Sequence, residues 1–201
     1  MLEIVLLRHP ETQWNRDKLI QGHTDIPPLD PTVPDSLVAS LMELGSIVAV
    51  YSSDLLRCSL PASELYNKIS QASSRSVLYQ ETSLLRERSF GVLEGKPYAE
   101  FGADNAGSLG EYLYRLPYII SGEDITAVKS RAFHASQLLL QHGTRKTEVV
   151  AVMTHGCFMN YVLNDLERRS DLSQYRVAGN LAGFRMRVEH EYVHEILPFP
   201  G

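Results

Sequence analysis

Short runs of consecutive apolar residues occur at three places along the chain and predict buried β-strands. They cover residues 3–7, 46–51 and 148–153. Runs that are apolar at every position, rather than at alternate ones, are typical of a parallel sheet covered on both faces. The second run ends at Ser52-Ser53-Asp54, a cluster that is suited to cap a following helix. Residues 75–79 are a weaker strand candidate.

Apolar residues at helical spacing fill the segments between these strands. Residues 54–69 and 124–142 carry such a pattern, and residues 158–166 follow the third strand as another predicted helix. Gly143 is expected to end the second of these helices. Pro61 predicts either a kink in the first helix or a helix that begins after it.

Near the end of the chain, apolar and polar residues alternate, which predicts strands rather than a further helix. Residues 183–197 predict a hairpin that turns near His190-Glu191. Residues 25–34 contain four prolines and predict a loop. Residues 91–122 predict a partly helical cap over a site, a common role for long irregular segments. We expect one α/β domain over residues 1–201, a three-layer α/β/α fold whose mostly parallel sheet has an antiparallel strand near its C-terminal edge.

Composition and charge narrow the possible functions. The 201 residues are 44% hydrophobic and carry a formal net charge of −5, so no basic field for nucleic acid or an acidic membrane is expected. No apolar stretch approaches the length of a membrane span, and the start of the chain lacks a signal-peptide pattern. With only two cysteines, Cys58 and Cys157, the expected location is the reducing cytoplasm. No cofactor or metal site is predicted: His190 and His194 have the spacing of helical ligands but lie in a strand-like segment.

Polar side chains follow each of the three predicted strands. They are Arg8-His9, Ser52-Ser53-Asp54 with Arg57 a turn later, and Thr154-His155. Ligands of open α/β sheets bind beyond the carboxyl ends of the strands. If the strands are parallel and adjacent, two histidines and two arginines meet at one edge. Such a cluster attracts phosphate, because one arginine can donate two parallel hydrogen bonds to phosphate oxygens and a histidine can act as a hydrogen-bond donor or as the nucleophile.

These residues also resemble a known family. The run Leu7-Arg8-His9-Pro10-Glu11-Thr12-Gln13-Trp14-Asn15 is similar to the Arg-His-Gly-Glu-Thr-x-x-Asn signature of the histidine phosphatase superfamily, which includes the cofactor-dependent phosphoglycerate mutases. Further segments resemble other motifs of that family in the same order: Ile20-Gln21-Gly22, Ser52 to Arg57, Leu85 to Gly95, Gly122-Glu123 with Arg131, Thr154-His155-Gly156 and Gly179-Asn180. The shared order across nearly the whole chain is what makes the resemblance specific.

The resemblance implies a role for each matched residue. His9 would attack phosphorus and carry the phosphoryl group, and His155 would stabilise the charge on the equatorial oxygens. Glu87 would protonate the leaving oxygen and then activate the water that hydrolyses phosphohistidine. Phosphoryl transfer needs mainly positioning and charge stabilisation, which would come here from cations without a metal. The residues implied to bind substrate are Arg8, Asn15, Gln21, Gly22, Arg57, Arg88 and Gly156.

Three departures from the family pattern affect these expectations. Pro10 stands where the family has glycine, which removes an N–H that would otherwise be free to bind phosphate. Residues 29–34 replace the usual start of the first helix, so that helix is expected to be reshaped. Ser59-Leu60-Pro61-Ala62 replaces the Gln-Thr-Ala that normally follows Arg57.

The expected activity is hydrolysis of a small phosphorylated, sugar phosphate-like metabolite. The segment from Leu85 to Lys96 most resembles fructose-2,6-bisphosphatase regulators of glycolysis, and the region after Gly95 lacks the clustered Lys and Arg that a mutase would need. A phosphoglycerate mutase is the alternative that Arg88 favours. A non-catalytic phospholigand-binding protein is the alternative that Pro10 favours.

Overall fold

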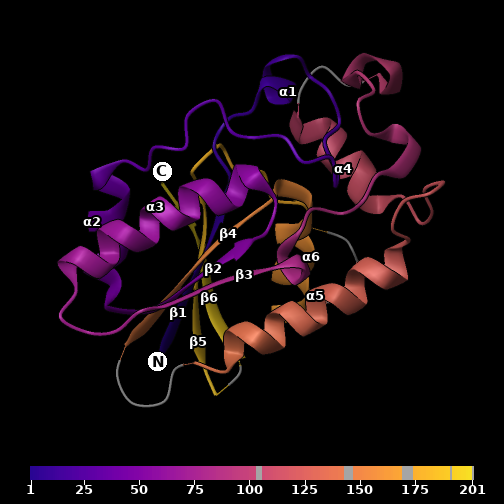
Figure 1. The fold of residues 1–201 in the computed structure, drawn as a ribbon. Helices are drawn as coiled ribbons and strands as arrows, with labels where there is room; N and C mark the ends of the chain where they lie inside the picture. Colours follow the sequence, from indigo (N-terminus) through magenta and orange to yellow (C-terminus); the bar gives the residue numbers. More distant parts are fainter. Residues whose placement is uncertain (103–105, 143–146, 169–173, 191, 201) are drawn as a thin grey trace.

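A six-stranded sheet lies at the centre of the computed structural model, which describes the chain apart from residues 103–105, 143–146, 169–173, 191 and 201 (Figure 1). The strand order is β3-β2-β4-β1-β5-β6. Neighbours among β3, β2, β4 and β1 are parallel, and β5 is antiparallel to both β1 and β6. The strands are β1 (Leu2–Arg8), β2 (Ser46–Ser53), β3 (Leu78–Thr82), β4 (Glu148–Thr154), β5 (Gly183–Glu189) and β6 (Tyr192–Phe199). This arrangement confirms the predicted fold class.

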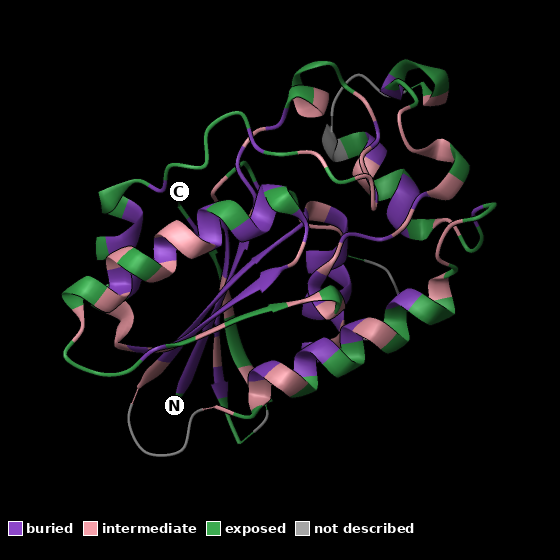
Figure 2. Cartoon of the chain, viewed as in Figure 1, coloured by how far each residue is buried: buried purple, intermediate pink, exposed green. Residues whose placement is uncertain are grey.

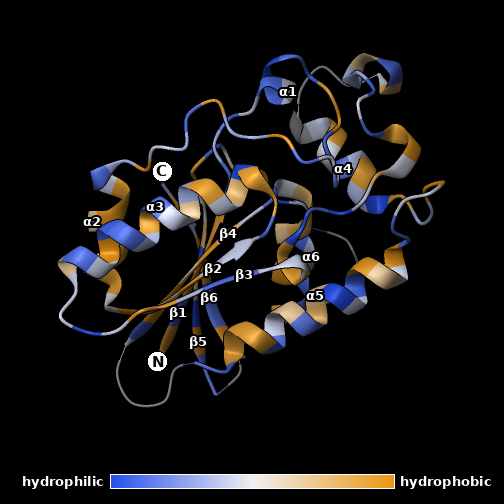
Figure 3. Ribbon diagram, in the orientation of Figure 1, coloured by the Kyte–Doolittle hydropathy of each residue, from blue (hydrophilic) through white to orange (hydrophobic). Residues whose placement is uncertain are grey.

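Helices cover both faces of the sheet, as the continuous apolar strands require. On one face, α2 (Asp35–Leu44) and α3 (Leu56–Ala72) pack on side chains such as Val5 and Leu7. On the other face, α5 (Ile125–Leu140) and α6 (Gly156–Leu166) pack on Ile4 and Leu6. Most residues of the inner strands are buried, and the helices are exposed on their outer sides (Figure 2), where the hydrophilic residues lie (Figure 3).

The helix α2 is not among the elements that the sequence pattern predicts. The signal is present: Leu37, Val38 and Leu41 are buried at helical spacing, and Pro34 immediately precedes the helix. Gly45 follows it with φ at 154°, a conformation that favours glycine. The prolines of residues 25–34 do form a loop, but that loop ends at Pro34 and a helix follows directly.

The helix α3 begins at Leu56, so the alternative of a start after Pro61 is wrong. Pro61 lies within its second turn, where its ring lacks only the N–H that would bond to the carbonyl of Arg57. The cap differs from the prediction as well, because the N-cap position is Leu55 rather than Asp54. The N–H of Leu56 is satisfied by the carboxylate of Asp25, at 2.8 Å.

The remaining predicted elements are found with small shifts. The third strand ends at Thr154 and α6 starts at Gly156, two residues before the predicted helix start. The weak strand candidate is β3, three residues later than predicted at each end. The hairpin is formed by β5 and β6, with His190 in a left-handed conformation at its turn. Gly143, the predicted helix stop, lies outside the described residues.

The segment between β3 and α5 lies at the carboxyl ends of the parallel strands, beside α6 (Figure 1). It contains the 3₁₀ turns η1 (Ser83–Leu85), η2 (Gly91–Leu93) and η3 (Tyr98–Phe101) and the helix α4 (Ala106–Arg115). Leu109 and Leu113 of α4 join the same apolar cluster as Phe158 of α6. The short helix α1 (Gln13–Arg16) follows β1 at the same end of the sheet. In the described part of the chain, no helix has the length and apolar character needed to cross a membrane.

A buried carboxylate ties β1 to the antiparallel strand β5. Glu3 accepts hydrogen bonds from Arg185 Nε and Nη2, both at 2.8 Å, and from Arg187 Nε at 3.2 Å. Burial alone would raise the pKa of Glu3, but the two guanidinium groups outweigh it and leave the pKa below its ordinary value. The pair therefore stabilises the fold while Glu3 is ionised.

We predict that Glu3→Gln lowers the free energy of unfolding by about 2–3 kcal/mol at neutral pH, because two arginines lose their buried acceptor. The contribution of Glu3 is present above its unfolded pKa and is lost as pH falls through the lower folded pKa. The gap between wild type and variant should therefore shrink as the pH drops below 4.5, the ordinary pKa of glutamate. Urea unfolding at several pH values measures this. Glu195→Gln, which removes a more exposed partner of Arg187, is the control, and an equal loss in both variants would contradict the prediction.

Candidate active site

The carboxyl ends of three adjacent parallel strands bring the predicted polar residues together. Arg8 of β1 is in register with Thr154 of β4, and the N–H of His9 donates to the carbonyl of Thr154 at 3.0 Å. The rings of His9 and His155 lie 5.3 Å apart between centroids. Arg57, from the first turn of α3 after β2, donates from Nε to His155 Nδ1 at 3.2 Å. The predicted convergence at this sheet edge is therefore what the structure contains.

The surroundings of His9 determine which of its ring nitrogens is free. Nδ1 lies 2.7 Å from the carbonyl oxygen of Pro10, which accepts only, so Nδ1 carries the proton and Nε2 keeps its lone pair. Asn180 donates to the carbonyl of His9 at 2.8 Å and fixes its backbone. Burial and the nearby charges of Arg57 and Arg8 hold the pKa of His9 well below its ordinary value. Proline at position 10 supplies the carbonyl that this tautomer needs, and only the N–H is lost.

His155 has the opposite tautomer. Because Arg57 Nε donates to Nδ1, the proton of His155 is on Nε2, which lies 2.9 Å from the hydroxyl of Ser53. The ring is fully buried, and burial, Arg57 and His9 together hold its pKa well below the ordinary value. Neither histidine is among the residues that line the neighbouring pocket.

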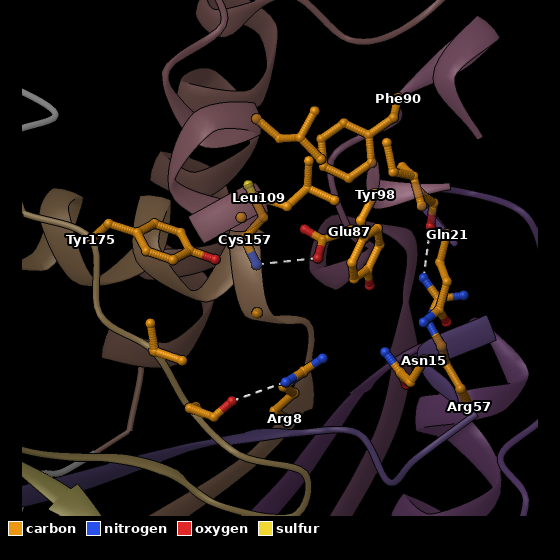
Figure 4. Close-up of a pocket in the computed structure, with 17 residues that line it drawn as sticks. Arg8, Asn15, Gln21, Arg57, Glu87, Phe90, Tyr98, Leu109, Cys157 and Tyr175 are labelled. Carbon is orange, nitrogen blue, oxygen red and sulfur yellow. Dashed lines mark hydrogen bonds between the residues drawn. The ribbon is translucent and has the colours of Figure 1, made fainter. Parts of the chain in front are cut away.

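Two arginines lie at the polar end of that pocket. Arg57 donates to the carbonyls of Thr24 and Gly22 as well as to His155, which uses three of its five N–H groups (Figure 4). Arg8 donates from Nη1 to the carbonyl of Ala178, and its Nε is buried without a partner. A buried guanidinium donor without a partner indicates a site built for an anion.

Asn15, Gln21 and Gly22 complete the polar end. A capping box at the start of α1 uses the carbonyl oxygen of Asn15 to accept from the N–H of Thr12 at 3.0 Å. The amide of Asn15 also bonds to the side chain of Tyr98, which leaves one of its two N–H groups for a further partner. The Oε1 of Gln21 is buried without a partner. Gly22 has φ at +56°, and a Cβ there would lie 2.1 Å from a carboxylate oxygen of Glu94, so no other residue fits.

Glu87 lies at the start of α6, where its carboxylate acts as the helix cap. It accepts from the backbone N–H groups of Phe158 at 2.7 Å and Arg88 at 2.9 Å, and from that of Cys157 at 3.1 Å, the last of which is drawn in Figure 4. Its own backbone carbonyl accepts from His23 Nε2 at 2.8 Å. The helix N-terminus thus fixes a carboxylate beside the two arginines, which is where an acid and base for a bound ester would be needed.

Arg131 of α5 holds the segment that carries Glu87. Its guanidinium forms an ion pair with Glu123 and donates to the carbonyls of Leu84, Arg86 and Glu87. It also lies 4.1 Å from the centroid of the Phe158 ring. The sequence alone indicates Arg131 only by resemblance, because its hydrogen bonds go to backbone atoms that no pattern of residues reveals.

The two arginines next to Glu87 in sequence bind other parts of the protein rather than the pocket. Arg86 forms a bidentate ion pair with Asp54, at 2.6 and 2.7 Å. Arg88 is fully buried and donates to the carbonyls of Glu123, Leu113 and Leu116. Arg88 does not line the pocket, so the structure does not bring it together with the other residues expected to bind substrate.

The pocket between α6 and the segment around α4 has a volume of about 90 Å³. Gly156 lines it, and a Cβ there would lie 3.6 Å from Arg8 Nε. Sequence reasoning missed most of the remaining wall, which is formed by Ile20, Phe90, Tyr98, Leu109, Gly110, Leu113, Cys157, Tyr175, Val177 and Ala178. Apolar residues in an irregular segment carry no signal that separates a pocket wall from a core. The described residues contain no group of histidine, cysteine or acidic side chains that would hold a metal ion.

We predict that His9 and His155 are still mainly neutral at pH 6.5, the ordinary pKa of histidine, and have opposite tautomers, with the proton on Nδ1 of His9 and on Nε2 of His155. Because both folded pKa values lie below the unfolded value of 6.5, the unfolded state takes up protons first, and stability falls as the pH drops below 6.5. Long-range ¹⁵N–¹H NMR spectra of the side chains report tautomer and charge directly. His9→Gln and His155→Gln assign the signals, and the exposed His190 is the internal reference. Protonation of both rings at pH 6.5 would contradict the assignment.

Comparisons with known proteins agree with this geometry. Residues 4–191 match the family model of the histidine phosphatase superfamily, branch 1. The chain is 33% identical over 132 residues to fructose-2,6-bisphosphatase TIGAR B of Danio rerio, a match that covers 64% of this chain and 49% of that protein. It thus spans about half the length of the TIGAR relatives. It is 30% identical over 171 residues to the probable phosphoglycerate mutase GpmB of Salmonella choleraesuis, with 81% and 75% covered.

A solved structure shows the same fold. The mycobacterial glucosyl-3-phosphoglycerate phosphatase complexed with VO3 has a TM-score of 0.74 to this chain at 21% sequence identity, with 98% of this chain and 96% of that chain covered. The family match over nearly the full length, the motifs in order and the shared fold lead to one conclusion. This chain belongs to the histidine phosphatase superfamily.

Proposed function

We propose that this protein hydrolyses a phosphate monoester of a small molecule by transferring the phosphoryl group first to His9 Nε2 and then to water. The observation that carries the proposal is the state of His9. Its Nδ1–H is held by the Pro10 carbonyl, and burial beside Arg8 and Arg57 lowers its pKa. A neutral imidazole with a free Nε2 next to two cations is the nucleophile that attack on a phosphate dianion requires.

The phosphoryl group would bind between the two arginines and the first turn of α1. The unpartnered Nε of Arg8 and the amide of Asn15 are donors available to its oxygens. Arg57 keeps two N–H groups beyond the three that bind His155 and backbone carbonyls. Two guanidinium charges offset the two charges of the phosphate, which removes most of the penalty for burying it.

His155 would stabilise the transferring group by donation from Nε2. Its proton is placed on that atom by the donation of Arg57 Nε to Nδ1. In the reaction, Nε2–H would exchange the Ser53 hydroxyl for an oxygen of the transferring group, which gains charge density as the bond to the leaving group breaks. Arg57 would thus bind phosphate itself and also hold the histidine that assists it.

Glu87 would handle the proton in both steps. In the first, His9 Nε2 attacks phosphorus, the bond to the ester oxygen breaks, and Glu87 supplies a proton to the departing alcohol. In the second, water attacks phosphorus, Glu87 takes its proton, and the phosphorus–nitrogen bond breaks to release phosphate and neutral His9. The amide groups at the start of α6 and the Arg131 contacts support this role by holding the carboxylate in one place.

The printed names of the relatives suggest two candidate reactions, fructose 2,6-bisphosphate hydrolysis and phosphoglycerate mutation. Arg88 is the residue that favours a mutase from sequence, and here its guanidinium binds backbone carbonyls of residues 113–123. Pro10 favours a non-catalytic protein from sequence, and here its carbonyl supports the nucleophilic tautomer of His9. Both observations favour hydrolysis over the mutase and the non-catalytic alternatives, whatever the alcohol of the ester.

We predict that a ³²P-labelled phosphate ester leaves an acid-labile, base-stable phosphate on the wild-type protein when turnover is quenched. His9→Ala should carry no label and should hydrolyse the ester about 10³-fold more slowly or worse, because the nucleophile is lost. Peptide mapping at alkaline pH locates the label. An acid-stable label, or one that persists in His9→Ala, would contradict the mechanism.

We further predict that Arg131→Lys lowers kcat by about tenfold with little change in KM, because lysine cannot hold Glu123 and three carbonyls at once. Misplacing Glu87 should also alter the pH dependence of kcat. Steady-state kinetics across a pH range measures both effects. Arg115→Lys, which alters an exposed ion pair with Glu111, is the matched control. A rise in KM with unchanged kcat would contradict the assigned positioning role.

A further inference from the structure

We propose that the preferred substrate is a monoester whose alcohol is uncharged and apolar, with a flat ring favoured over a polyol, and that a second anionic group is excluded. This inference rests on the proposed hydrolysis and specifies its leaving group. It follows from the pocket wall, whose two ends differ in chemistry. Figure 4 shows Phe90 and Leu109 on one side of Glu87, and Arg8, Asn15 and Arg57 on the other.

The apolar end of the pocket receives the part of the substrate beyond the ester oxygen. Glu87, the proposed proton donor, marks where that oxygen must lie. Beyond it the wall includes Phe90, Leu109 and Leu113 from the η2 and α4 segment, while residues 175–178 form the side of the pocket that runs from there to Arg8. Carbon surface against these side chains is removed from water, whereas each buried hydroxyl of a polyol would need its own partner.

Charge in the wall argues against a second phosphate or a carboxylate. Among the described residues that line the pocket, the cations are Arg8 and Arg57, and both belong to the end where the transferred phosphate would bind. A second anion beyond Glu87 would be buried near a carboxylate with no positive charge to offset it. Such a group costs several kcal/mol in a protein interior unless it is paired.

Within the part of the chain that the structure describes, the arginines and lysines that flank the lining segments have other partners. Lys96 pairs with Glu100 and Arg115 with Glu111, each pair four residues apart. Arg176 forms a bidentate ion pair with Glu167. Arg88 is fully buried among backbone carbonyls. Arg88 and Arg176 could enter the pocket only by breaking buried or partly buried contacts, and the exposed Lys96 and Arg115 are not among its lining residues.

The aromatic side chains of the pocket favour a flat ring. Phe90, Tyr98 and Tyr175 place three aromatic rings in its wall. Aromatic rings pack best on other rings at offset or edge-to-face angles. Gly110 of α4 lies against the hydroxyl of Tyr175, where a Cβ would come within 2.1 Å, so α4 and Tyr175 close this end tightly.

The test uses a matched series of benzyl phosphates, in which the chemistry of the leaving oxygen is nearly constant. Benzyl phosphate and 4-carbamoylbenzyl phosphate are neutral beyond the ester, and 4-carboxybenzyl phosphate has the same size as the carbamoyl compound but one added negative charge. We expect kcat/KM for the carbamoyl ester to exceed that of the carboxy ester by about 30-fold or more, as expected for an unpaired buried charge. Benzyl phosphate should also exceed glycerol phosphate by about tenfold.

Two outcomes separate this inference from the proposed function. If all the esters release phosphate through His9 but the carboxy ester equals or exceeds the carbamoyl ester, the leaving-group inference is overturned and the hydrolase stands. If no ester releases phosphate and no label reaches His9, the hydrolase itself fails, and the inference fails with it.

A positive charge placed in the pocket wall should reduce the selectivity against the carboxy ester. Val177 lines the pocket and is 65% exposed, so Val177→Lys is tolerated by the fold and brings an ammonium group to the side wall formed by residues 175–178. The carbamoyl-to-carboxy ratio should fall about tenfold in this variant, because the added anion gains a partner. Val92→Lys, at a residue that is 49% exposed and outside the pocket lining, is the matched control and should keep the wild-type ratio. An unchanged ratio in Val177→Lys would overturn the placement of the leaving group.

Discussion

The parallel pairing of β1 with β4 is the constraint on which the rest of the site depends. With Arg8 opposite Thr154, the residues that follow each strand are His9 and His155, and the two rings must share one small volume. Two buried imidazoles beside two guanidinium groups would be strongly destabilising if the imidazoles were charged. Their lowered pKa values are therefore a consequence of the sheet register, as much as a property of the chemistry.

Neutral histidines can act in catalysis only if each ring keeps its proton on a defined nitrogen. Neighbouring groups of the protein fix that nitrogen for both rings. The Pro10 carbonyl accepts a hydrogen bond from His9 Nδ1–H and so keeps the proton of His9 on Nδ1, and donation from Arg57 to His155 Nδ1 keeps the proton of His155 on Nε2. Glu87 is fixed in a similar way. Amide groups at the start of α6 donate to its carboxylate, and His23 and Arg131 donate to its backbone carbonyl. Four elements far apart in sequence, β1, α3, α5 and α6, thus position three side chains without any metal or disulfide among the described residues.

The sequence predicted the parallel strands and the main residues of the site, but not every helix. The continuous apolar runs predicted the parallel strands, and the rule that ligands bind beyond strand ends predicted that His9, Arg57 and His155 would meet. The strand register that brings these residues together depends on tertiary packing, but three buried strands allow few other strand arrangements. The helix α2 was missed because the prolines before it dominated the local pattern, although Leu37, Val38 and Leu41 carried a helical signal.

Contacts to backbone atoms were the hardest to predict. Arg88 and Arg131 both stand in motifs of the family, yet their guanidinium groups are directed at carbonyls, which every residue possesses and no sequence pattern marks. Asp54 was expected to cap α3 and instead pairs with Arg86, because Asp25 from a distant loop takes the capping role. A local rule fails in such cases when a partner far away in sequence competes for the same group.

The difference between the two ends of the pocket explains why the motifs of this family define the reaction better than the substrate. The residues that would hold phosphate come from strand ends and helix starts, where the sheet fixes them and where a change disrupts several contacts at once. The apolar wall comes from α4 and residues 175–178, outside the sheet, where one side chain can change without disturbing the register of β1 and β4. Selection on the leaving group therefore acts on positions that the catalytic geometry does not constrain, and a chain that keeps every phosphate ligand is free to change the alcohol it releases.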